Sequence, residues 1–376
     1  MTALKSSFEM AGIAGECSRN RRRPARLGRG HRARHVYARR VKAVVLHETG
    51  PIDNLRYEEV ATPQPGPGQV LVEVRAAGVC HRDVIDRRGG FPFMKKPVVP
   101  GHEFAGVVTA VGDGVTDFAV GDRVVNLHRA PCGECDYCRA GHEPCCQRQM
   151  AMYGLTVDGG YAEFVAADAG SLVPLPAGIP FEQACFLACT AGIALRGLAS
   201  RAHLRPGERV LVTGASGGVG LHGIQVAKAL GATVVAVTSS QTKAEILRMY
   251  GADDVVVSTD GAFNRRVDGV DVVLECVGVP TLEASVRSCR PMGRVVVAGN
   301  VTVDRYPVNP GYLILNEIAI VGTHGCTRRD LEQVFDWVRA RTLRPVLDET
   351  LPLEQAREAH RRLEAKAASG RIVLTP

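Results

Sequence analysis

One stretch near the middle of the chain reads Arg209-Val210-Leu211-Val212-Thr213-Gly214-Ala215-Ser216-Gly217-Gly218-Val219-Gly220. Its apolar first part has the length and composition of a buried strand, and a glycine-rich turn follows that opens a helix. Backbone N–H groups at the start of such a helix converge on one point, where they can bind a pyrophosphate. The sequence therefore predicts a dinucleotide site formed by Gly214, Ser216, Gly217, Gly218, Val219 and Gly220.

Strand-like and helix-like segments alternate around this turn, between about residues 208 and 323. Apolar runs occur at 209–213, 233–238, 270–275 and 293–298, with helical patterns between them. This alternation predicts an α/β fold with a doubly wound, parallel sheet that helices cover on both faces. In contrast, short strands broken by Gly and Pro fill residues 41 to about 180, and 371–374 reads as a last strand. Thr327 and Asp330 predict the cap of a further helix.

Length and cysteine content limit the class of protein. With 376 residues, 45% of them hydrophobic, the chain can form two domains with separate cores. No apolar run approaches the eighteen or so residues of a membrane span, so we expect no membrane partner. Twelve cysteines in a chain of this size, without the apolar region of a secretory signal, favour reduced, metal-binding thiols over disulfides. We therefore expect a reducing, cytoplasmic location.

The formal net charge of +7 comes from the first forty residues. They contain eleven Lys or Arg and two acidic residues, whereas the rest of the chain contains 35 basic and 37 acidic residues. A nearly neutral body gives no electrostatic reason to bind nucleic acid. Residues 1–40 suit a transit peptide or a nucleic-acid-binding arm, but we expect a disordered extension, because a folding pattern begins only at Val41. Our hypothesis is that translation starts there.

Several cysteines have the spacing of metal ligands. A C-x2-C-x2-C-x7-C pattern is formed by Cys132, Cys135, Cys138 and Cys146. Four thiolates fill the tetrahedral shell of zinc and leave no position for chemistry, so this pattern predicts a structural zinc. Two distant thiols and an imidazole, those of Cys80, Cys189 and His102, supply what an open zinc needs to polarise a bound oxygen. The sequence thus predicts two zinc ions per chain.

The end of the second predicted strand bears on which dinucleotide binds. Where an acidic residue would bind the ribose 2′-hydroxyl of NAD, the chain has Thr238, Ser239 and, slightly later, Lys243. Hydroxyl donors and one ammonium suit a 2′-phosphate, so we expect NADP(H) to be preferred over NAD(H). The alternative is that Lys243 is a solvated residue in the first turn of a helix.

These motifs occur in the order and spacing of zinc-containing medium-chain alcohol dehydrogenases. From Val41 to Pro376 the chain resembles this family, through the four-cysteine pattern, Cys189, the glycine turn, Gly101-His102-Glu103 and Gly78-Val79-Cys80-His81-Arg82-Asp83. The resemblance implies a β-rich, GroES-like catalytic domain around a Rossmann coenzyme domain. On that basis we expect catalytic segments at 41–190 and 325–376 and the coenzyme domain at 191–324. It also implies a homodimer or homotetramer joined through coenzyme domains.

The resemblance assigns roles to the metal-ligand candidates. Cys80, His102 and Cys189 would hold the catalytic zinc, and Glu103 would lie beside it as an outer or exchangeable ligand. Cys189 is chosen over Cys185 from its distance to the turn at 204–207. Taken singly, each of these residues could be a core thiol or a loop histidine, and only their joint occurrence favours a metal site.

Further roles follow for the neighbours of these ligands. Asp83 would orient His102, and His81 and Arg371 would reach the coenzyme pyrophosphate, although both could be surface charges. Typical family members have Ser or Thr, which relays the alcohol proton, where this chain has Arg82. A guanidinium stays charged and has no acceptor, so it cannot relay a proton. Arg82 could attract an anionic substrate, stabilise an enolate, bind coenzyme A phosphates, or point away and pair with a nearby acid.

Three hypotheses of function remain. The leading one is a zinc-containing alcohol dehydrogenase or aldehyde reductase, acting on a small alcohol or aldehyde. The second is an NADPH-dependent reductase of enoyl thioesters, because the Cys-x-Arg-Asp arrangement and the segments 299–301 and 311–315 are similar to those of archaeal acryloyl-coenzyme A reductases. The third is a nucleotide-binding protein without catalysis, which the complete ligand set disfavours.

Overall fold

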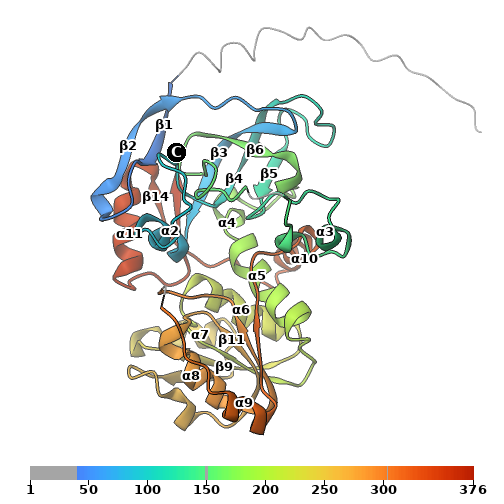
Figure 1. The fold of residues 1–376 in the computed structure, drawn as a ribbon, viewed down its shortest axis with the longest axis vertical. Helices are drawn as coiled ribbons and strands as arrows, with labels where there is room; N and C mark the ends of the chain where they lie inside the picture. The colour runs from blue at the N-terminus through green and yellow to red at the C-terminus, as the bar shows by residue number, and fades with distance from the viewer. Residues whose placement is uncertain (1–39, 149–150, 303) are drawn as a thin grey trace, which may run out of the picture.

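The computed structural model describes residues 40–148, 151–302 and 304–376. The expected amino-terminal extension, and with it the hypothesis about the start of translation, lies outside these residues except for Arg40. The described chain forms two lobes, seen one above the other in Figure 1. We call them the upper lobe and the lower lobe.

The lower lobe contains the predicted parallel sheet. Its six strands are β8 (Arg209–Val212), β9 (Thr233–Thr238), β10 (Asp254–Val257), β11 (Val270–Glu275), β12 (Cys289–Val297) and β13 (Ala319–Gly322). All are parallel, in the spatial order β10-β9-β8-β11-β12-β13. This is the strand order of a dinucleotide-binding Rossmann sheet, and its topological switch point lies beside β8. Every residue of β11 is buried, so helices and loops cover both faces.

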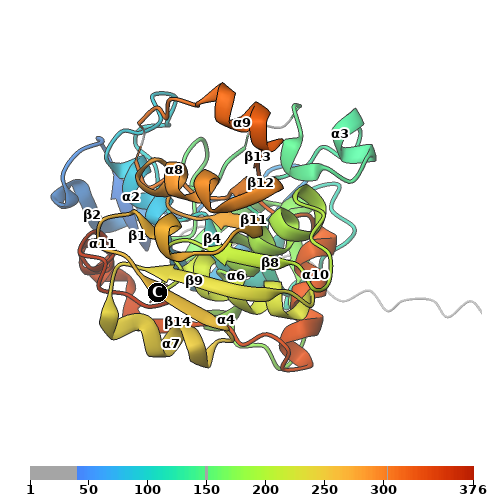
Figure 2. The ribbon, with the colours of Figure 1, turned by 90° about the horizontal axis from the view of Figure 1, so that it is seen from below.

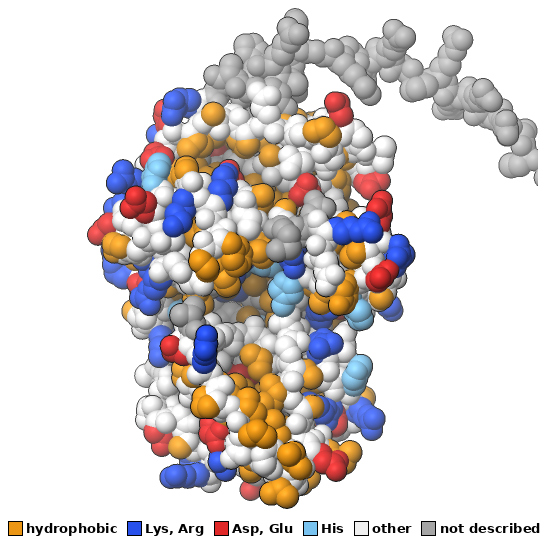
Figure 3. All heavy atoms as spheres, in the orientation of Figure 1, with side chains coloured by type: hydrophobic (Ala, Val, Ile, Leu, Met, Phe, Trp, Pro, Cys, Tyr) orange, Lys and Arg blue, Asp and Glu red, His pale blue; other side chains and the backbone are white. Residues whose placement is uncertain are grey.

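The helices of the lower lobe connect these strands. They are α6 (Gly218–Ala229), α7 (Ala244–Met249), α8 (Val279–Ser288) and α9 (Pro310–Asn316). Viewed from below, α7 lies on the β9 side of the lobe and α9 on the β12 and β13 side (Figure 2). Apolar side chains gather on the surface around α9 (Figure 3), where Ile314 and Leu315 are 72% and 85% exposed.

One helical stretch, Phe181–Arg201, is long and apolar enough by composition to cross a membrane, but 78% of its apolar window is buried in the fold. It comprises α4 (Phe181–Ala184), η4 (Ala188–Gly192), α5 (Ile193–Leu195) and η5 (Arg196–Arg201), and η4 and η5 are π-helical. Its middle part packs against α6. Burial inside the protein identifies it as a core helix.

The upper lobe is built on a mainly antiparallel sheet. Its path is β14 (Leu347–Pro352), β15 (Arg371–Thr375), β3 (Gln69–Val79), β4 (Glu103–Val111), β5 (Arg123–Asn126) and β7 (Leu172–Pro174), and β6 (Phe164–Asp168) also pairs with β3. A separate ribbon pairs β1 (Arg40–Leu46) with β2 (Leu55–Ala61). The last strand, β15, lies between β14 and β3, so the carboxy-terminal segment returns to the sheet that the first segment forms.

Short helices complete the upper lobe. They are α2 (His81–Arg87), α3 (Asp136–Arg139), α10 (Arg328–Arg339) and α11 (Ala356–Glu364). The helix predicted from Thr327 and Asp330 is confirmed as α10, because the Asp330 N–H donates to the Thr327 hydroxyl and the Thr327 N–H donates to the Asp330 carboxylate. Helix α2 contacts α11, and its residues Asp83, Val84, Asp86 and Arg87 are buried.

Candidate active site

Sheet register brings the distant metal-ligand candidates together. Gly78 on β3 pairs with Glu103 on β4, so Cys80, just after β3, lies beside His102, just before β4. Cys189 reaches the same point from the π-helical turn η4. One ligand atom from each of Cys80, His102, Glu103 and Cys189 lies within 4.8 Å of the others. Cys185 is not in this group, and its thiol donates to the carbonyl of Glu182.

Asp83 fixes the orientation of the His102 ring. Its Oδ1 lies 2.8 Å from Nδ1 of His102, while its Oδ2 accepts hydrogen bonds from the Cys80 N–H and the Tyr161 hydroxyl. A carboxylate beside Nδ1 keeps the proton on that nitrogen. Nε2 is then free as a ligand atom, and it faces the Cys189 sulfur at 3.4 Å.

The chemistry of this cluster fits a zinc ion. Two thiols and one imidazole are preferred zinc ligands, and three protein ligands leave a position open. A hydrogen bond from Cys189 and the charge of Arg371 lower the pKa of Cys80 well below its ordinary value, although burial opposes them. Neither buried carboxyl oxygen of Glu103 accepts a hydrogen bond, although Arg371 Nη2 lies 2.9 Å from Oε1. Burial raises the pKa of Glu103 to about 7.

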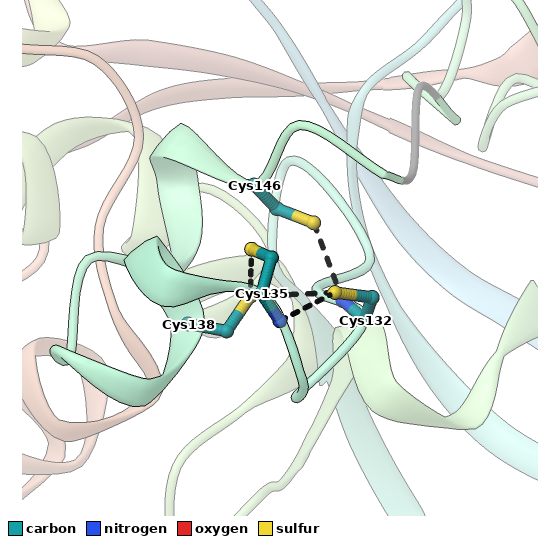
Figure 4. Close-up of side chains that lie close together, drawn as sticks. All are labelled: Cys132, Cys135, Cys138 and Cys146. Atoms are coloured by element: carbon teal, nitrogen blue, oxygen red, sulfur yellow. Dashed lines mark hydrogen bonds between the residues drawn. The ribbon is translucent and has the colours of Figure 1, made fainter.

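The cysteines of the predicted C-x2-C-x2-C-x7-C pattern form a second cluster, shown in Figure 4. One sulfur from each of Cys132, Cys135, Cys138 and Cys146 lies within 4.8 Å of the others. The loop that carries them contains α3 and the short turn η2 (Glu143–Cys145), and its backbone hydrogen bonds between residues 135 and 146 join groups three to five positions apart. Four convergent thiols fit a closed, tetrahedral zinc site. Cys145 is exposed and does not belong to this cluster.

The glycine turn lies next to the first cluster. Helix α6 begins at Gly218, and a Cβ atom there would meet the Arg371 guanidinium at 3.0 Å. The backbone of Gly217 also forms a bridge with Gly370. The guanidinium of Arg371 thus lies between the start of α6 and Glu103. From the other side, Nε2 of His81 approaches the carbonyl of Val301 at 3.4 Å.

Comparison with known proteins places the chain in a family. Residues 66–177 match the alcohol dehydrogenase GroES-like domain, and residues 218–340 match the zinc-binding dehydrogenase model. The chain is 42% identical over 336 residues to acryloyl-coenzyme A reductase of Metallosphaera sedula, covering 89% of this chain and 100% of the relative. The chain belongs to the medium-chain alcohol dehydrogenase superfamily. It is therefore an oxidoreductase. The predicted architecture, a Rossmann domain with a GroES-like domain, is confirmed.

Other members of this superfamily are nearly as similar to the chain. An alcohol dehydrogenase of Geobacillus stearothermophilus is 36% identical over 327 residues, covering 85% of this chain and 96% of the relative. Among solved structures, the crystal structure of AibC matches with a TM-score of 0.86 and 39% identity, covering 94% of this chain and 99% of that one. Since relatives of different activity are similar, the substrate of this medium-chain dehydrogenase must be inferred from its own residues.

Polar groups of the upper lobe hold the guanidinium of Arg82, which follows Cys80 by two positions in this medium-chain dehydrogenase. Its Nη2 forms an ion pair with Asp86 at 2.8 Å and donates to the Tyr153 carbonyl at 3.1 Å. Its Nη1 lies 3.2 Å from Nε2 of His128, whose ring contacts His102 edge-on with ring centres 5.1 Å apart. Because a guanidinium only donates, Nε2 of His128 is the acceptor and its proton is on Nδ1. Burial and Arg82 lower the pKa of His128 well below its ordinary value.

Two residues of this group were missed in the sequence. Asp86 follows Arg82 by four positions, which places the two side chains on one face of a helix. The ion pair could therefore have been predicted from the sequence. His128 carries no such signal, because it follows a short strand of the upper lobe and meets Arg82 only through the fold.

The residues proposed to select the coenzyme lie at the end of β9. Thr238 is buried and its hydroxyl accepts a hydrogen bond from the Ser240 N–H, while Ser239 is exposed. Lys243 donates to the carbonyls of Lys366 and Ala368 in the carboxy-terminal segment. The ammonium is therefore not simply solvated: it links the two lobes beside the coenzyme crevice.

Proposed function

We propose that this dehydrogenase reduces the C=C bond of a 2-enoyl-coenzyme A, with NADPH as the hydride donor. The observation that carries the proposal is the Arg82 guanidinium, which stands where typical alcohol dehydrogenases have a hydroxyl relay and meets His102 through the His128 ring. It pairs with Asp86, yet its Nε–H has no partner among the described residues and so can still donate. The similarity to acryloyl-coenzyme A reductase supports the same assignment.

The two chemistries place different demands on this position. Hydride addition to the β-carbon of an enoyl thioester moves the π electrons towards the thioester carbonyl, and a proton is then added at the α-carbon. Negative charge develops on the carbonyl oxygen, and a fixed guanidinium stabilises such an oxyanion. Alcohol oxidation instead requires the hydroxyl proton to leave through an acceptor, which Arg82 does not provide.

The residues that would hold zinc have distinct tasks. Cys80, His102 and Cys189 would be its ligands, with Glu103 beside them, and Asp83 keeps the His102 ring in the orientation that offers Nε2. Zinc bound there supplies Lewis acidity towards a carbonyl oxygen. The four-cysteine cluster would hold a second zinc whose role is to fold its loop.

Preference for NADPH follows from the crevice at the end of β9. Residues 238–243 contain no acid that would repel a 2′-phosphate, and the exposed Ser239 offers a hydroxyl. Two carbonyl acceptors leave one of the three Lys243 N–H donors for the phosphate. The guanidinium of Arg371, on β15, lies against the start of α6, where it could contact the pyrophosphate.

Product analysis tests the proposal. The purified protein, with its zinc content measured, is incubated with NADPH and either acryloyl-coenzyme A or a panel of aldehydes. We expect oxidation of NADPH with the enoyl thioester and formation of the saturated acyl thioester. Turnover of aldehydes alone would overturn the proposal and leave the second candidate.

That second candidate is alcohol dehydrogenase or aldehyde reductase activity. One observation favours it, namely the complete cluster of Cys80, His102 and Cys189, the ligand set that zinc needs to bind an alcohol oxygen. Oxidation of alcohols with NADP at a rate comparable to enoyl reduction would support it.

We also propose that the chain assembles through its lower lobe into a homodimer or homotetramer in a reducing, intracellular compartment. The apolar surface around α9 supports the first point, because Ile314 and Leu315 are exposed in the single chain. Two clusters of reduced thiols support the second. Light scattering of the wild type and of Leu315→Glu tests the assembly, and we expect only the wild type to form the oligomer.

A further inference from the structure

Glu275, the last residue of β11, is fully buried and accepts hydrogen bonds from several parts of the lower lobe. Its Oε1 accepts from the Thr213 hydroxyl at 2.7 Å, the Val277 N–H at 2.8 Å, the Gly278 N–H at 2.9 Å and the Thr281 hydroxyl at 2.8 Å. Its Oε2 accepts from the Ser285 hydroxyl on α8. All five donors are neutral, so the carboxyl group organises backbone and hydroxyl groups and does not pair with a cation.

The donors come from the two sides of the coenzyme crevice. Thr213 is the last residue before the glycine turn, and its hydroxyl also accepts the Cys276 N–H at 2.9 Å. Glu275 thereby ties the end of β8 to the turn after β11. Dinucleotides bind outside the carboxyl ends of the strands at the switch point of such a sheet, which here lies beside β8.

The turn held by Glu275 contacts the glycine loop directly. A Cβ atom at Gly214 would meet Cγ2 of Val277 at 2.8 Å, so Val277 lies against the first glycine of the loop. The Val277 carbonyl accepts the Val301 N–H at 2.8 Å, and the Val301 carbonyl is the group that His81 approaches. A shift of this turn would therefore move the glycine loop and the segment that meets the upper lobe.

We infer that Glu275, acting through Thr213 and the turn 276–278, is a positioning residue for the coenzyme. It acts through these groups and makes no contact with the coenzyme itself. It holds the glycine loop and the opposite wall of the crevice at the separation that the dinucleotide requires. The inference rests on the proposed use of NADPH only for the choice of ligand, because the crevice geometry applies to either nicotinamide dinucleotide.

Two substitutions of residues that donate to the Glu275 carboxyl group distinguish an effect on coenzyme binding from an effect on protein stability. Thr213→Val keeps the side-chain shape but removes the link to the glycine loop and leaves the Cys276 N–H without its acceptor. Ser285→Ala removes a hydrogen bond to Oε2 on the α8 side, away from that loop. Thr213→Val loses two buried hydrogen bonds and Ser285→Ala loses the one to Glu275, so both are expected to melt at a lower temperature than the wild type, Thr213→Val at the lower of the two.

The measurements are the dissociation constant of NADPH by fluorescence titration, without substrate, together with KM and kcat where turnover is found. For Thr213→Val we expect the dissociation constant and the KM of NADPH to rise about tenfold, because the glycine loop is no longer tied to the turn 276–278, with kcat nearly unchanged. For Ser285→Ala we expect both constants within about twofold of the wild type, because the lost hydrogen bond joins Glu275 to α8 and leaves the links to Thr213 and to the turn 276–278 in place.

The inference is overturned if the two variants differ by less than about threefold in the dissociation constant, since a merely structural role predicts equal effects. If Thr213→Val does not fold, Thr213→Ala replaces it and is compared with Thr213→Ser, which keeps the hydroxyl: the dissociation constant of NADPH should rise for Ala and stay within about twofold of the wild type for Ser, and equal values would contradict the inference. Binding is measured without substrate, so this result is independent of whether the enzyme reduces C=C or C=O bonds. A wild type that binds only NADH is tested with NADH.

Discussion

Arg82 and Asp86 form an ion pair that is largely removed from water, with side chains 18% and 1% exposed. Breaking such a pair usually costs about 3–5 kcal/mol, because the partner is left as an uncompensated buried charge. Burial already raises the pKa of Asp86 to about 7, so its carboxyl group can take up a proton when Arg82 is lost. For Arg82→Met we therefore expect a smaller loss, roughly 2–3 kcal/mol of unfolding free energy, measured by urea denaturation at pH 7.

A double substitution and a surface pair serve as controls for this prediction. Adding Asp86→Asn to Arg82→Met should restore most of the lost free energy, because the buried charge is gone. Arg75→Met breaks the exposed pair with Glu73 and should change stability by less than about 0.5 kcal/mol. If the double variant is no more stable than Arg82→Met alone, the ion pair does not explain the loss.

The loop of the four-cysteine cluster depends on its thiols, since α3 and η2 are each a single turn. We expect Cys138→Ser to lower the zinc content from two ions per chain to one and to expose the loop to limited proteolysis, while the first cluster, formed by Cys80, His102, Glu103 and Cys189, keeps its metal. The neighbouring Cys145→Ser is the matched control, because this exposed thiol lies outside the cluster. Equal zinc content in both variants, measured by elemental analysis, would contradict the assignment.

Helix α6 carries a buried histidine that makes stability depend on pH. Nε2 of His222 accepts the Val346 N–H at 3.1 Å, so Nδ1 must carry the proton that is donated to the Gly218 carbonyl at 2.6 Å. Burial lowers the pKa of His222 to about 4, whereas the unfolded chain titrates near its ordinary value, so between these values the unfolded state binds more protons. Stability contributed by the neutral ring is complete above pH 6.5 and is lost as the pH falls towards 4, by roughly 3 kcal/mol.

Urea denaturation at pH 7 and pH 4.5 measures this contribution. We expect His222→Gln to be less sensitive to pH than the wild type over this range, since Gln has donor and acceptor groups but does not titrate. An unchanged dependence on pH in the variant would show that other groups cause the acid sensitivity.

The elements differ in how far the sequence specifies them. The glycine turn, the strands of the lower sheet and the cap of α10 were predictable, because each depends on local composition or on a fixed period. The π-helical turn that presents Cys189 has no local signature, and Cys189 was separated from Cys185 only by family spacing. The contacts of Arg82 with His128 and of Glu275 with Thr213 join residues 46 and 62 positions apart, which only the sheets bring together.

At the scale of the whole molecule, the carboxy-terminal segment joins the lobes. After α11 it passes the coenzyme crevice, where the carbonyls of Lys366 and Ala368 accept hydrogen bonds from Lys243, and then enters the upper sheet with Arg371 against the start of α6. One segment thereby contacts both ends of the proposed coenzyme site. The sequence allowed a role to be predicted for Arg371 of this segment. The hydrogen bonds between the segment and Lys243 could not be predicted, because they depend on the packing of the lobes.

The Lys243 link makes a final prediction possible. Lys243→Met removes two hydrogen bonds to carbonyls whichever coenzyme is bound, and with NADPH it also removes the ammonium proposed to contact the 2′-phosphate. The KM values for NADH and NADPH should therefore both rise, but that for NADPH by about a further tenfold, as expected for a lost hydrogen bond to a charged group. Lys228→Met is the control, because Lys228 pairs with Asp253 at the far end of α6 and should leave the ratio of the two KM values unchanged. If the KM values for NADH and NADPH rise by the same factor in Lys243→Met, this residue joins the lobes but does not contact the 2′-phosphate.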